Sequence, residues 1–211
     1  MKAADNMPPL DHCIYPVILS VPPQSRKLNG RARVKMLSLL ARQALELCAG
    51  KCDLQIGELR KSTHGVPLPF HGHYWSLTHK PAYVGAVISL QRTGIDIEEI
   101  RPVSEALYHR VAKDQEWQLG GQRSEMLFFR FWTAKEAVLK AEGLGMAGLS
   151  KCAVTQILDR QHIQLCCRDT DYWIEQIYFD DHIASVVKNK LDTQWTIARH
   201  HRVLNSTWEK E

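Results

Sequence analysis

Two carboxylates stand close together in the segment GIDIE at residues 94–98. On a β-strand, residues i and i+2 share a face, so Asp96 and Glu98 should point together while the intervening isoleucines are buried on the other side. Like charges at this spacing repel unless a cation lies between them, and such pairs suit Mg²⁺ that also binds a phosphate-bearing substrate. The alternative is a solvated edge strand whose outer face carries charge.

A second group of reactive side chains lies on a helix expected over residues 124–142. Four of its residues are spaced by four and form a single file on one face: Phe128, Trp132, Glu136 and Lys140. Glu136 could add a third carboxylate to the first pair, and Lys135 and Lys140 could then hold phosphate oxygens. The alternative is a salt bridge between Glu136 and Lys140, which would contribute only ~0.3 kcal/mol on an exposed face.

The segment SLTH at 76–79 places a hydroxyl and an imidazole at a strand end, just before a proline-containing turn. Thr78 and His79 could bind phosphate there, although an ordinary strand end would look the same. Basic residues also gather earlier in the chain, at Arg26, Lys27, Arg31, Arg33 and Lys35. They form either an anion site or a solvated surface.

These residues must be positioned by a mixture of helices and short strands. Hydrophobic periodicity predicts helices over 33–49, with Gly50 as its stop, over 103–112 and over 124–142, with a polar loop before the last. Strands are expected over 14–21, 74–77, 83–90, 94–100, 152–158, 162–168, 172–179, 183–188 and 194–199. This order predicts an α+β fold with mainly antiparallel sheets and a hinge near Arg101 and Pro102.

The two halves echo each other faintly. HYWSLTHKPAYVGAVIS in the first half is similar to YWIEQIYFDDHIASVVKN in the second, with an aromatic strand, a tight turn and an apolar strand in each. Either the chain contains a duplication, or two hairpins of a common type occur in it.

Composition excludes several classes of protein. The 211 residues are 45% apolar and 24% charged with a net charge of +4, which is typical of a soluble globular protein and too weakly basic to favour nucleic acid. The chain starts without a signal-peptide pattern, and its apolar runs are too short to cross a membrane. Its six cysteines show no CxxC motif. Because the chain shows no export signal, we expect six reduced thiols and a cytoplasmic protein.

Taken together, SLTH, GIDIE and FWTAKEAVLKAEG at 131–143 closely resemble the phosphopantetheinyl transferase superfamily, and its two-lobed branch in particular. The signature positions met are Gly94, Ile95, Asp96, Glu98, Trp132, Thr133, Lys135, Glu136, Ala137 and Lys140. The resemblance covers about residues 33–149. From Lys151 onward only the strand pattern matches.

The resemblance implies Mg²⁺-dependent transfer of the 4'-phosphopantetheine arm of coenzyme A to a serine of an apo acyl or peptidyl carrier protein. Adenosine 3',5'-bisphosphate would be released, and the carriers would serve fatty-acid, polyketide or nonribosomal peptide synthesis. It also implies that the protein is a monomer. Two similar lobes of the one chain, residues 1–101 and 102–211, would form a pseudo-dimer. Each lobe would have a mainly antiparallel sheet and a long helix, with coenzyme A and Mg²⁺ in the cleft between them.

Carried over residue by residue, the resemblance makes Asp96, Glu98 and Glu136 the Mg²⁺ ligands. The residues assigned to coenzyme A are Thr78 and His79 at its phosphates, Arg33 at the 3'-phosphate, Lys140 at the pyrophosphate with Lys135 beside it, and Arg26 and Lys27. Glu116 would position or deprotonate the serine. Glu116 or Glu136, acting directly or through a metal-bound water, could be the base.

One departure concerns a cation. Many relatives have G-K-P where this chain has Gly65-Val66-Pro67, and Arg60, Lys61 or His64 could replace the missing lysine. Two other functions compete with the transferase. One is a Mg²⁺-dependent hydrolase of a nucleotide or coenzyme A pyrophosphate, and the other is a non-catalytic module that binds coenzyme A or a carrier.

Overall fold

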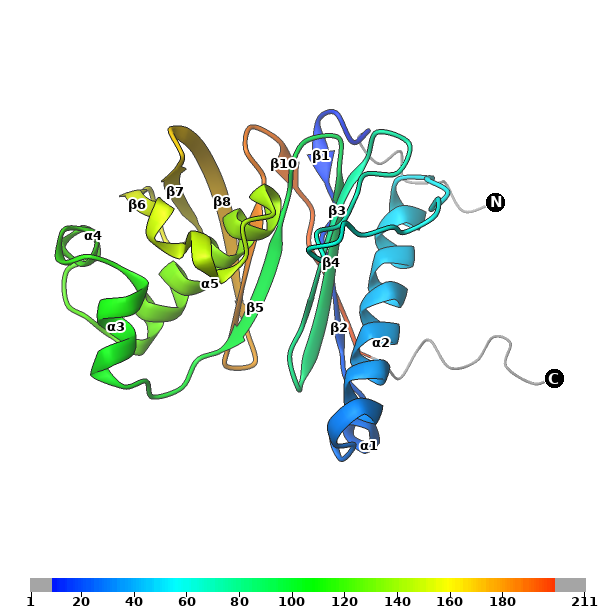
Figure 1. Cartoon of the computed structure of the whole chain (residues 1–211), viewed down its shortest axis with the longest axis horizontal. Helices are drawn as coiled ribbons and strands as arrows, with labels where there is room; N and C mark the ends of the chain where they lie inside the picture. The colour runs from blue at the N-terminus through cyan, green and yellow to red at the C-terminus, as the bar shows by residue number, and fades with distance from the viewer. Residues whose placement is uncertain (1–8, 200–211) are drawn as a thin grey trace, which may run out of the picture.

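The computed structural model describes residues 9–199 and shows a mixed α+β fold with mainly antiparallel sheets, as the sequence predicts (Figure 1). One sheet has the strand order β11-β2-β4-β3, a second has the order β5-β9-β8-β7-β6, and β1 pairs with β10. No helix within residues 9–199 is both long enough and apolar enough to span a membrane.

The first sheet is covered on one face by a long helix, α2 (Gly30–Lys51). Its strands are β2 (Val17–Ser20), β3 (Tyr74–His79), β4 (Tyr83–Ser89) and β11 (Thr196–Ala198), with β1 (Cys13–Ile14) and β10 (Asp192–Thr193) beside them and α1 (Pro23–Arg26) before α2. The buried face of α2 packs on Trp75 and on alternate residues of β4. The predicted stop at Gly50 is wrong, because the helix continues to Lys51 with Cys48 and Ala49 still buried.

The second sheet packs against α5 (Glu125–Glu142), the helix that carries the single file of side chains. Its strands are β5 (Ile95–Glu99), β6 (Cys152–Ile157), β7 (His162–Cys167), β8 (Thr170–Phe179) and β9 (His182–Val187), and a short 3-10 helix, η1 (Met146–Lys151), precedes β6. The bounds predicted for α5 are confirmed. Ser124 Oγ accepts a hydrogen bond from the Leu127 amide at its start, and Gly143 ends it in the left-handed conformation, at φ 67°.

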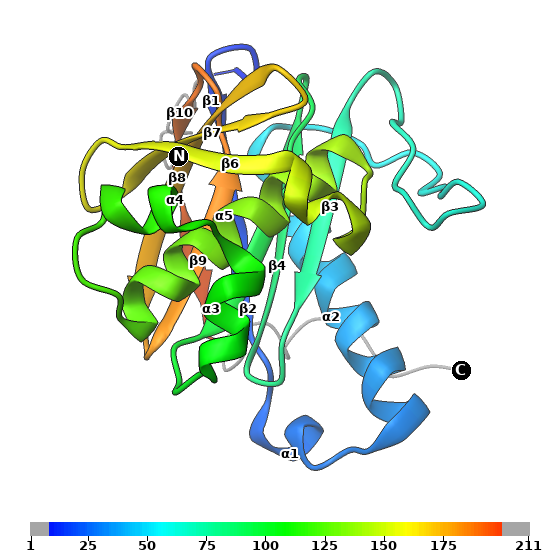
Figure 2. The same ribbon diagram turned by 60° about the vertical axis from the view of Figure 1, so that its left-hand side comes forward.

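Two shorter helices, α3 (Glu105–Val111) and α4 (Asp114–Leu119), lie on the side of α5 away from β3 (Figures 1 and 2). Helix α4 occupies the stretch predicted as a polar loop. It forms because Trp117 is buried and because Glu116 caps the helix, accepting a hydrogen bond from the Lys113 amide at 2.9 Å.

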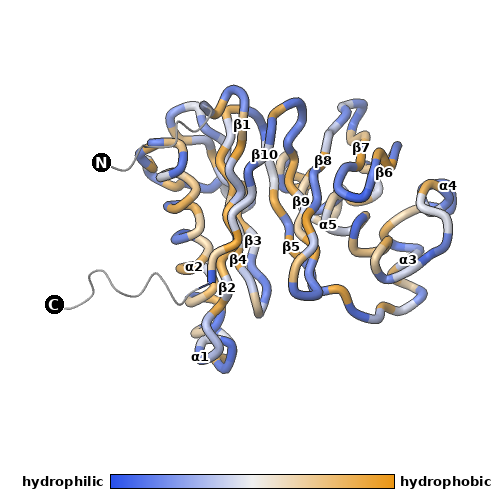
Figure 3. The backbone as a smooth tube through the Cα atoms, turned by 180° about the vertical axis from the view of Figure 1, so that it is seen from behind, coloured by the Kyte–Doolittle hydropathy of each residue, from blue (hydrophilic) through white to orange (hydrophobic). Residues whose placement is uncertain are grey.

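Apolar side chains fill the space where the two sheets meet. Ile95 packs with Val87 and Val186, and Ile97 packs with Ile18 and Ala184. The tube in Figure 3 shows the apolar residues that run along these strands. The prediction that the isoleucines of GIDIE are buried is therefore confirmed.

Strand pairing bears on the domain boundaries, which remain a prediction. β5, which the sequence assigns to the first lobe, pairs with β9, while β10 and β11 from the end of the chain pair in parallel with β1 and β2. The chain therefore crosses between the sheets twice.

The cysteines differ in part from expectation. Cys152 and Cys167 face each other on β6 and β7 with their Cα atoms 4.2 Å apart, and a disulfide joins them. The expectation of six reduced thiols is wrong for this pair, because the strand register brings together two cysteines that are 15 residues apart. The other four thiols are free.

Gly94, directly before β5, packs against the backbone of α5, and we expect Gly94→Ala to destabilise the protein. A Cβ atom at this position would lie 1.9 Å from the Ala137 carbonyl oxygen, so either the strand or the helix must move. We expect a loss of about 3 kcal/mol in the free energy of unfolding, measured by urea denaturation. The control is Gly50→Ala, which meets nothing within 4 Å and should stabilise α2 by ~0.5–1 kcal/mol. Equal effects of the two substitutions would contradict this packing.

Candidate active site

The candidate site begins where β3, an edge strand of the first sheet, lies beside β5. Three side chains from β3 and its following turn contact β5: Ser76 Oγ accepts from the Ile95 amide at 3.3 Å, Thr78 Oγ1 donates to Asp96 Oδ1 at 3.0 Å, and Lys80 Nζ donates to Glu98 Oε1 at 2.6 Å. The SLTH and GIDIE motifs are therefore in direct contact.

Helix α5 contacts the same strand with its single file of side chains. Trp132 Nε1 donates to Glu98 Oε1 at 2.8 Å, and Lys140 Nζ lies 2.8 Å from Asp96 Oδ1. Lys140 thus forms its ion pair with β5, and the predicted alternative, a pair with Glu136, is not the one that the structure shows. The shared face predicted from the spacing of four is confirmed for Trp132 and Lys140, because both reach the paired carboxylates.

Glu136 lies between these two contacts on α5. Burial raises the pKa of its carboxyl, and the nearby Asp96 carboxylate raises it further, against the opposing effects of Lys140 and Lys80. The pKa of Lys80 is also raised: burial acts to lower it, but the attraction of the Asp96, Glu98 and Glu136 carboxylates outweighs burial. The pKa values of Glu136 and Lys80 therefore both depend on the charged groups around them.

The chemistry of these groups fits a hard divalent cation. Carboxylate oxygens are the ligands that Mg²⁺ prefers. Asp96 is only 3% exposed, and its Oδ2 atom is buried with no hydrogen-bond partner among the described residues. Nevertheless, within residues 9–199 no three side chains of Asp, Glu, His or Cys are grouped so as to hold a metal ion. Lysine ammonium groups hold Asp96 and Glu98 instead.

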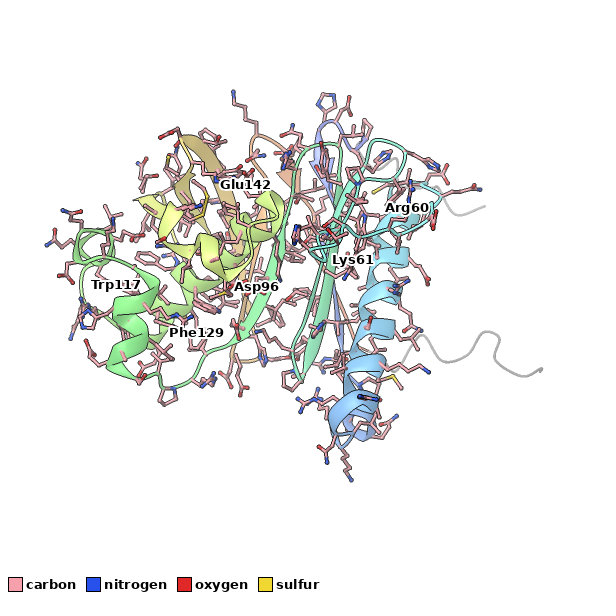
Figure 4. The ribbon with its side chains drawn as sticks, viewed as in Figure 1. Arg60, Lys61, Asp96, Trp117, Phe129 and Glu142 are labelled. Carbon is pink, nitrogen blue, oxygen red and sulfur yellow. A yellow bond between two sulfur atoms is a disulfide. The ribbon has the colours of Figure 1, made fainter. Side chains whose placement is uncertain are left out.

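A cavity of about 560 Å³ adjoins this cluster, with Glu136 and Lys140 in its wall. Its other lining residues come from the loop before β3, from β3 and from the end of α5, and include Lys61, His64 and Val66. Figure 4 labels Lys61 on this loop and Asp96 beside α5. Two of the three proposed replacements for the missing cation therefore reach the cavity. Arg60 is exposed and pairs with Glu58.

His79 ends β3 beside these lysines, and we expect it to be neutral at pH 7. Its partial burial and the positive charge of Lys140 lower its pKa. An NMR titration should therefore give its imidazole a midpoint below the ordinary histidine value of ~6.5, with His79→Gln to assign the signal. A midpoint above that value would contradict this electrostatic environment.

Glu116 and Lys135 lie elsewhere, in a buried ion pair that joins α4 to α5. Lys135 Nζ is 2.6 Å from Glu116 Oε2 and donates to the Val111 carbonyl at 2.8 Å, while Glu116 also accepts from the Val154 amide at 2.8 Å. Lys135 is 1% exposed. The structure therefore does not bring them to the Asp96 cluster, and their predicted roles in catalysis and coenzyme A binding remain predictions.

The basic residues before α2 are distributed around its start. Arg26 Nε donates to the Val21 carbonyl at 2.9 Å, and its guanidinium also reaches Ala82 in the turn that carries Lys80. Lys27 is exposed, and Arg33 lies half-buried in the first turns of α2. Lys80 itself was not among the predicted site residues, although its position directly after SLTH was a signal that could have found it.

Comparison with known proteins shows the family to which the chain belongs. Residues 92–198 match the family model described as the 4'-phosphopantetheinyl transferase superfamily, which is half of the chain, and the chain belongs to this superfamily. It is 35% identical over 82 residues to 4'-phosphopantetheinyl transferase psf-1 of Bacillus pumilus, covering 36% of this chain and 35% of the relative.

Two further relatives extend the comparison. The chain is 34% identical over 90 residues to 4'-phosphopantetheinyl transferase HetI of Nostoc sp., covering 39% of this chain and 38% of the relative. It is 26% identical over 149 residues to a putative 4'-phosphopantetheinyl transferase of Haemophilus influenzae, covering 66% and 63%. The chain thus spans little more than a third of the length of psf-1 and of HetI.

Proposed function

We propose that this protein transfers the 4'-phosphopantetheine arm of coenzyme A to a serine hydroxyl of an apo acyl or peptidyl carrier protein, in a Mg²⁺-dependent reaction. The observation that carries the proposal is the meeting of Thr78, Asp96, Glu98, Glu136 and Lys140 beside a cavity of about 560 Å³. Family membership supports it. The proposal includes a cytoplasmic monomer whose two lobes enclose the cleft.

The reaction exchanges one P–O bond for another. The serine Oγ forms a bond to the pyrophosphate phosphorus that carries the pantetheine arm, and the bond from that phosphorus to the bridging oxygen breaks. The electron pair leaves with adenosine 3',5'-bisphosphate. A Mg²⁺ ion held by Asp96, Glu98 and Glu136 would neutralise the pyrophosphate oxygens.

The chain's own side chains would orient the pyrophosphate and accept the serine proton. Lys140 and Thr78 present an ammonium and a hydroxyl beside Asp96, where they can hold phosphate oxygens. Glu136 is favoured over Glu116 as the proton acceptor because it lies in the wall of the cavity. Both oxygens of Glu116 already accept hydrogen bonds from backbone amides.

Lys61 is proposed to supply the cation that Val66 lacks, so we expect Lys61→Met to weaken coenzyme A binding. Lys61 lines the cavity, and losing one charged contact to a phosphate costs about 1 kcal/mol, so the KM for coenzyme A should rise about fivefold with kcat nearly unchanged. The neighbouring substitution Arg60→Met is the control, because Arg60 pairs with Glu58 at the surface. A larger effect at Arg60 than at Lys61 would contradict the assignment.

Release of adenosine 3',5'-bisphosphate separates the transferase from the two competing functions. The transferase should release it from coenzyme A only when an apo carrier is added. Release without a carrier would mean hydrolysis of the pyrophosphate, and coenzyme A binding without release under either condition would mean a non-catalytic module.

A further inference from the structure

Lys80 forms an ion pair with Glu98, one of the three carboxylates proposed to bind the metal. Its Nζ atom lies 2.6 Å from Glu98 Oε1, and the same oxygen accepts the Trp132 indole N–H at 2.8 Å. The pair is partly shielded from water, with the two side chains 31% and 13% exposed. Shielding strengthens such an ion pair, so breaking it has a cost.

The neighbouring carboxylate is neutralised in the same way. Asp96 Oδ1 accepts hydrogen bonds from Thr78 and Lys140, which leaves Oδ2 as its unpartnered oxygen. Lys80 feels the charge of all three carboxylates, since Asp96 and Glu136 act on its ammonium along with Glu98. The protein thus supplies its own cations to a cluster that would otherwise repel itself.

A divalent cation at this cluster would need the Glu98 carboxylate, which forms an ion pair with Lys80. For Glu98 to become a metal ligand, it must exchange the ammonium for the metal, and an ammonium left beside a divalent cation would be repelled by it. In the described part of the chain, Lys80 is paired with Glu98 and Lys140 with Asp96.

We propose that Lys80 is an internal competitor of the divalent cation, holding Glu98 in the metal-free protein and lowering the affinity of the site for metal. This inference rests on the proposed function, because it concerns the same metal site. Coenzyme A would relieve the competition, since its phosphates offer the displaced ammonium a new anionic partner. Metal and coenzyme A should therefore each strengthen the binding of the other.

The test is metal binding to Lys80→Met, with Mn²⁺ as the probe. Free Mn²⁺ is measured by electron paramagnetic resonance during titration of the full chain without coenzyme A. We expect the dissociation constant to fall about tenfold relative to the unchanged protein, equivalent to ~1.4 kcal/mol. In EDTA, the melting temperature of Lys80→Met should also be lower, because the carboxylates lose a counterion, and Mn²⁺ should restore it.

Two controls separate charge from position. Lys80→Arg keeps the positive charge and should bind Mn²⁺ nearly as the unchanged protein does. Lys190→Met removes the same charge from an exposed position after β9 and should change nothing. Lys80→Gln repeats the test with a polar side chain, in case the methionine variant does not fold.

The outcomes distinguish this inference from the proposed function. Unchanged or weaker Mn²⁺ binding by folded Lys80→Met or Lys80→Gln would overturn the inference alone. Weaker binding would further mean that Lys80 positions Glu98 for the metal. If the unchanged protein bound no Mn²⁺, with or without coenzyme A, the metal site itself would be contradicted, and the proposed function with it.

Discussion

Replacing Asp96 by asparagine should reduce phosphopantetheine transfer at least about a thousandfold while the protein stays folded. Asp96 is the carboxylate with a buried free oxygen, and a bound divalent cation contributes several kcal/mol of transition-state stabilisation that the neutral amide would forfeit. Glu136→Gln should give a similar loss. Activity is measured as carrier modified per minute at saturating coenzyme A, with circular dichroism to check the fold.

Glu99→Gln is the matched control for Asp96→Asn. Glu99 lies on the same strand and is exposed, so removing its charge tests whether any lost carboxylate on β5 would have the same effect. We expect its transfer rate to stay within about twofold of the unchanged rate, since surface charges contribute little. Full activity of Asp96→Asn in Mg²⁺ would contradict the assignment of Asp96 as a metal ligand.

The second large effect concerns the buried ion pair between Glu116 on α4 and Lys135 on α5. Lys135→Met should lower the free energy of unfolding by about 3–5 kcal/mol, because it leaves the Glu116 carboxylate buried without its counterion. Glu116→Gln should cause a similar loss, because it leaves the Lys135 ammonium buried without its counterion. Urea denaturation measures both, and the double variant Glu116→Gln with Lys135→Met should lose less than the sum of the two.

The same variants decide between a structural and a catalytic Glu116. If the pair supports α4, α5 and β6, Glu116→Gln should show a lowered melting temperature and retain transfer at temperatures where it is folded. A variant with normal stability and no transfer would mean that Glu116 acts on the serine, as the family resemblance implies. Double-mutant coupling of less than 0.5 kcal/mol would contradict the buried pair.

Local patterns in the sequence were enough to predict much of the site. The alternation of GIDIE places Asp96 and Glu98 together because side chains alternate on any strand, and the spacing of four aligns Trp132 with Lys140 on any helix. The start and end of α5 could be predicted from Ser124 and Gly143 for similarly local reasons.

Contacts between distant segments could not be predicted in this way. The Lys80–Glu98 pair depends on β3 lying beside β5, and the Glu116–Lys135 pair depends on where α4 packs. The return of β11 to β2 joins residues nearly 180 apart in the chain. The register of β6 and β7 also places Cys152 opposite Cys167, and their disulfide could not be predicted from the cysteine spacing alone.

Intact-mass spectrometry of apo carrier proteins tests the central claim most directly. An apo acyl carrier and an apo peptidyl carrier are each incubated with the protein, coenzyme A and Mg²⁺, with EDTA in a parallel reaction. We predict that at least one carrier gains the mass of one phosphopantetheine arm, and that EDTA abolishes the gain. No gain on either carrier, from a protein that binds coenzyme A and Mg²⁺, would contradict the proposed transfer to these carriers.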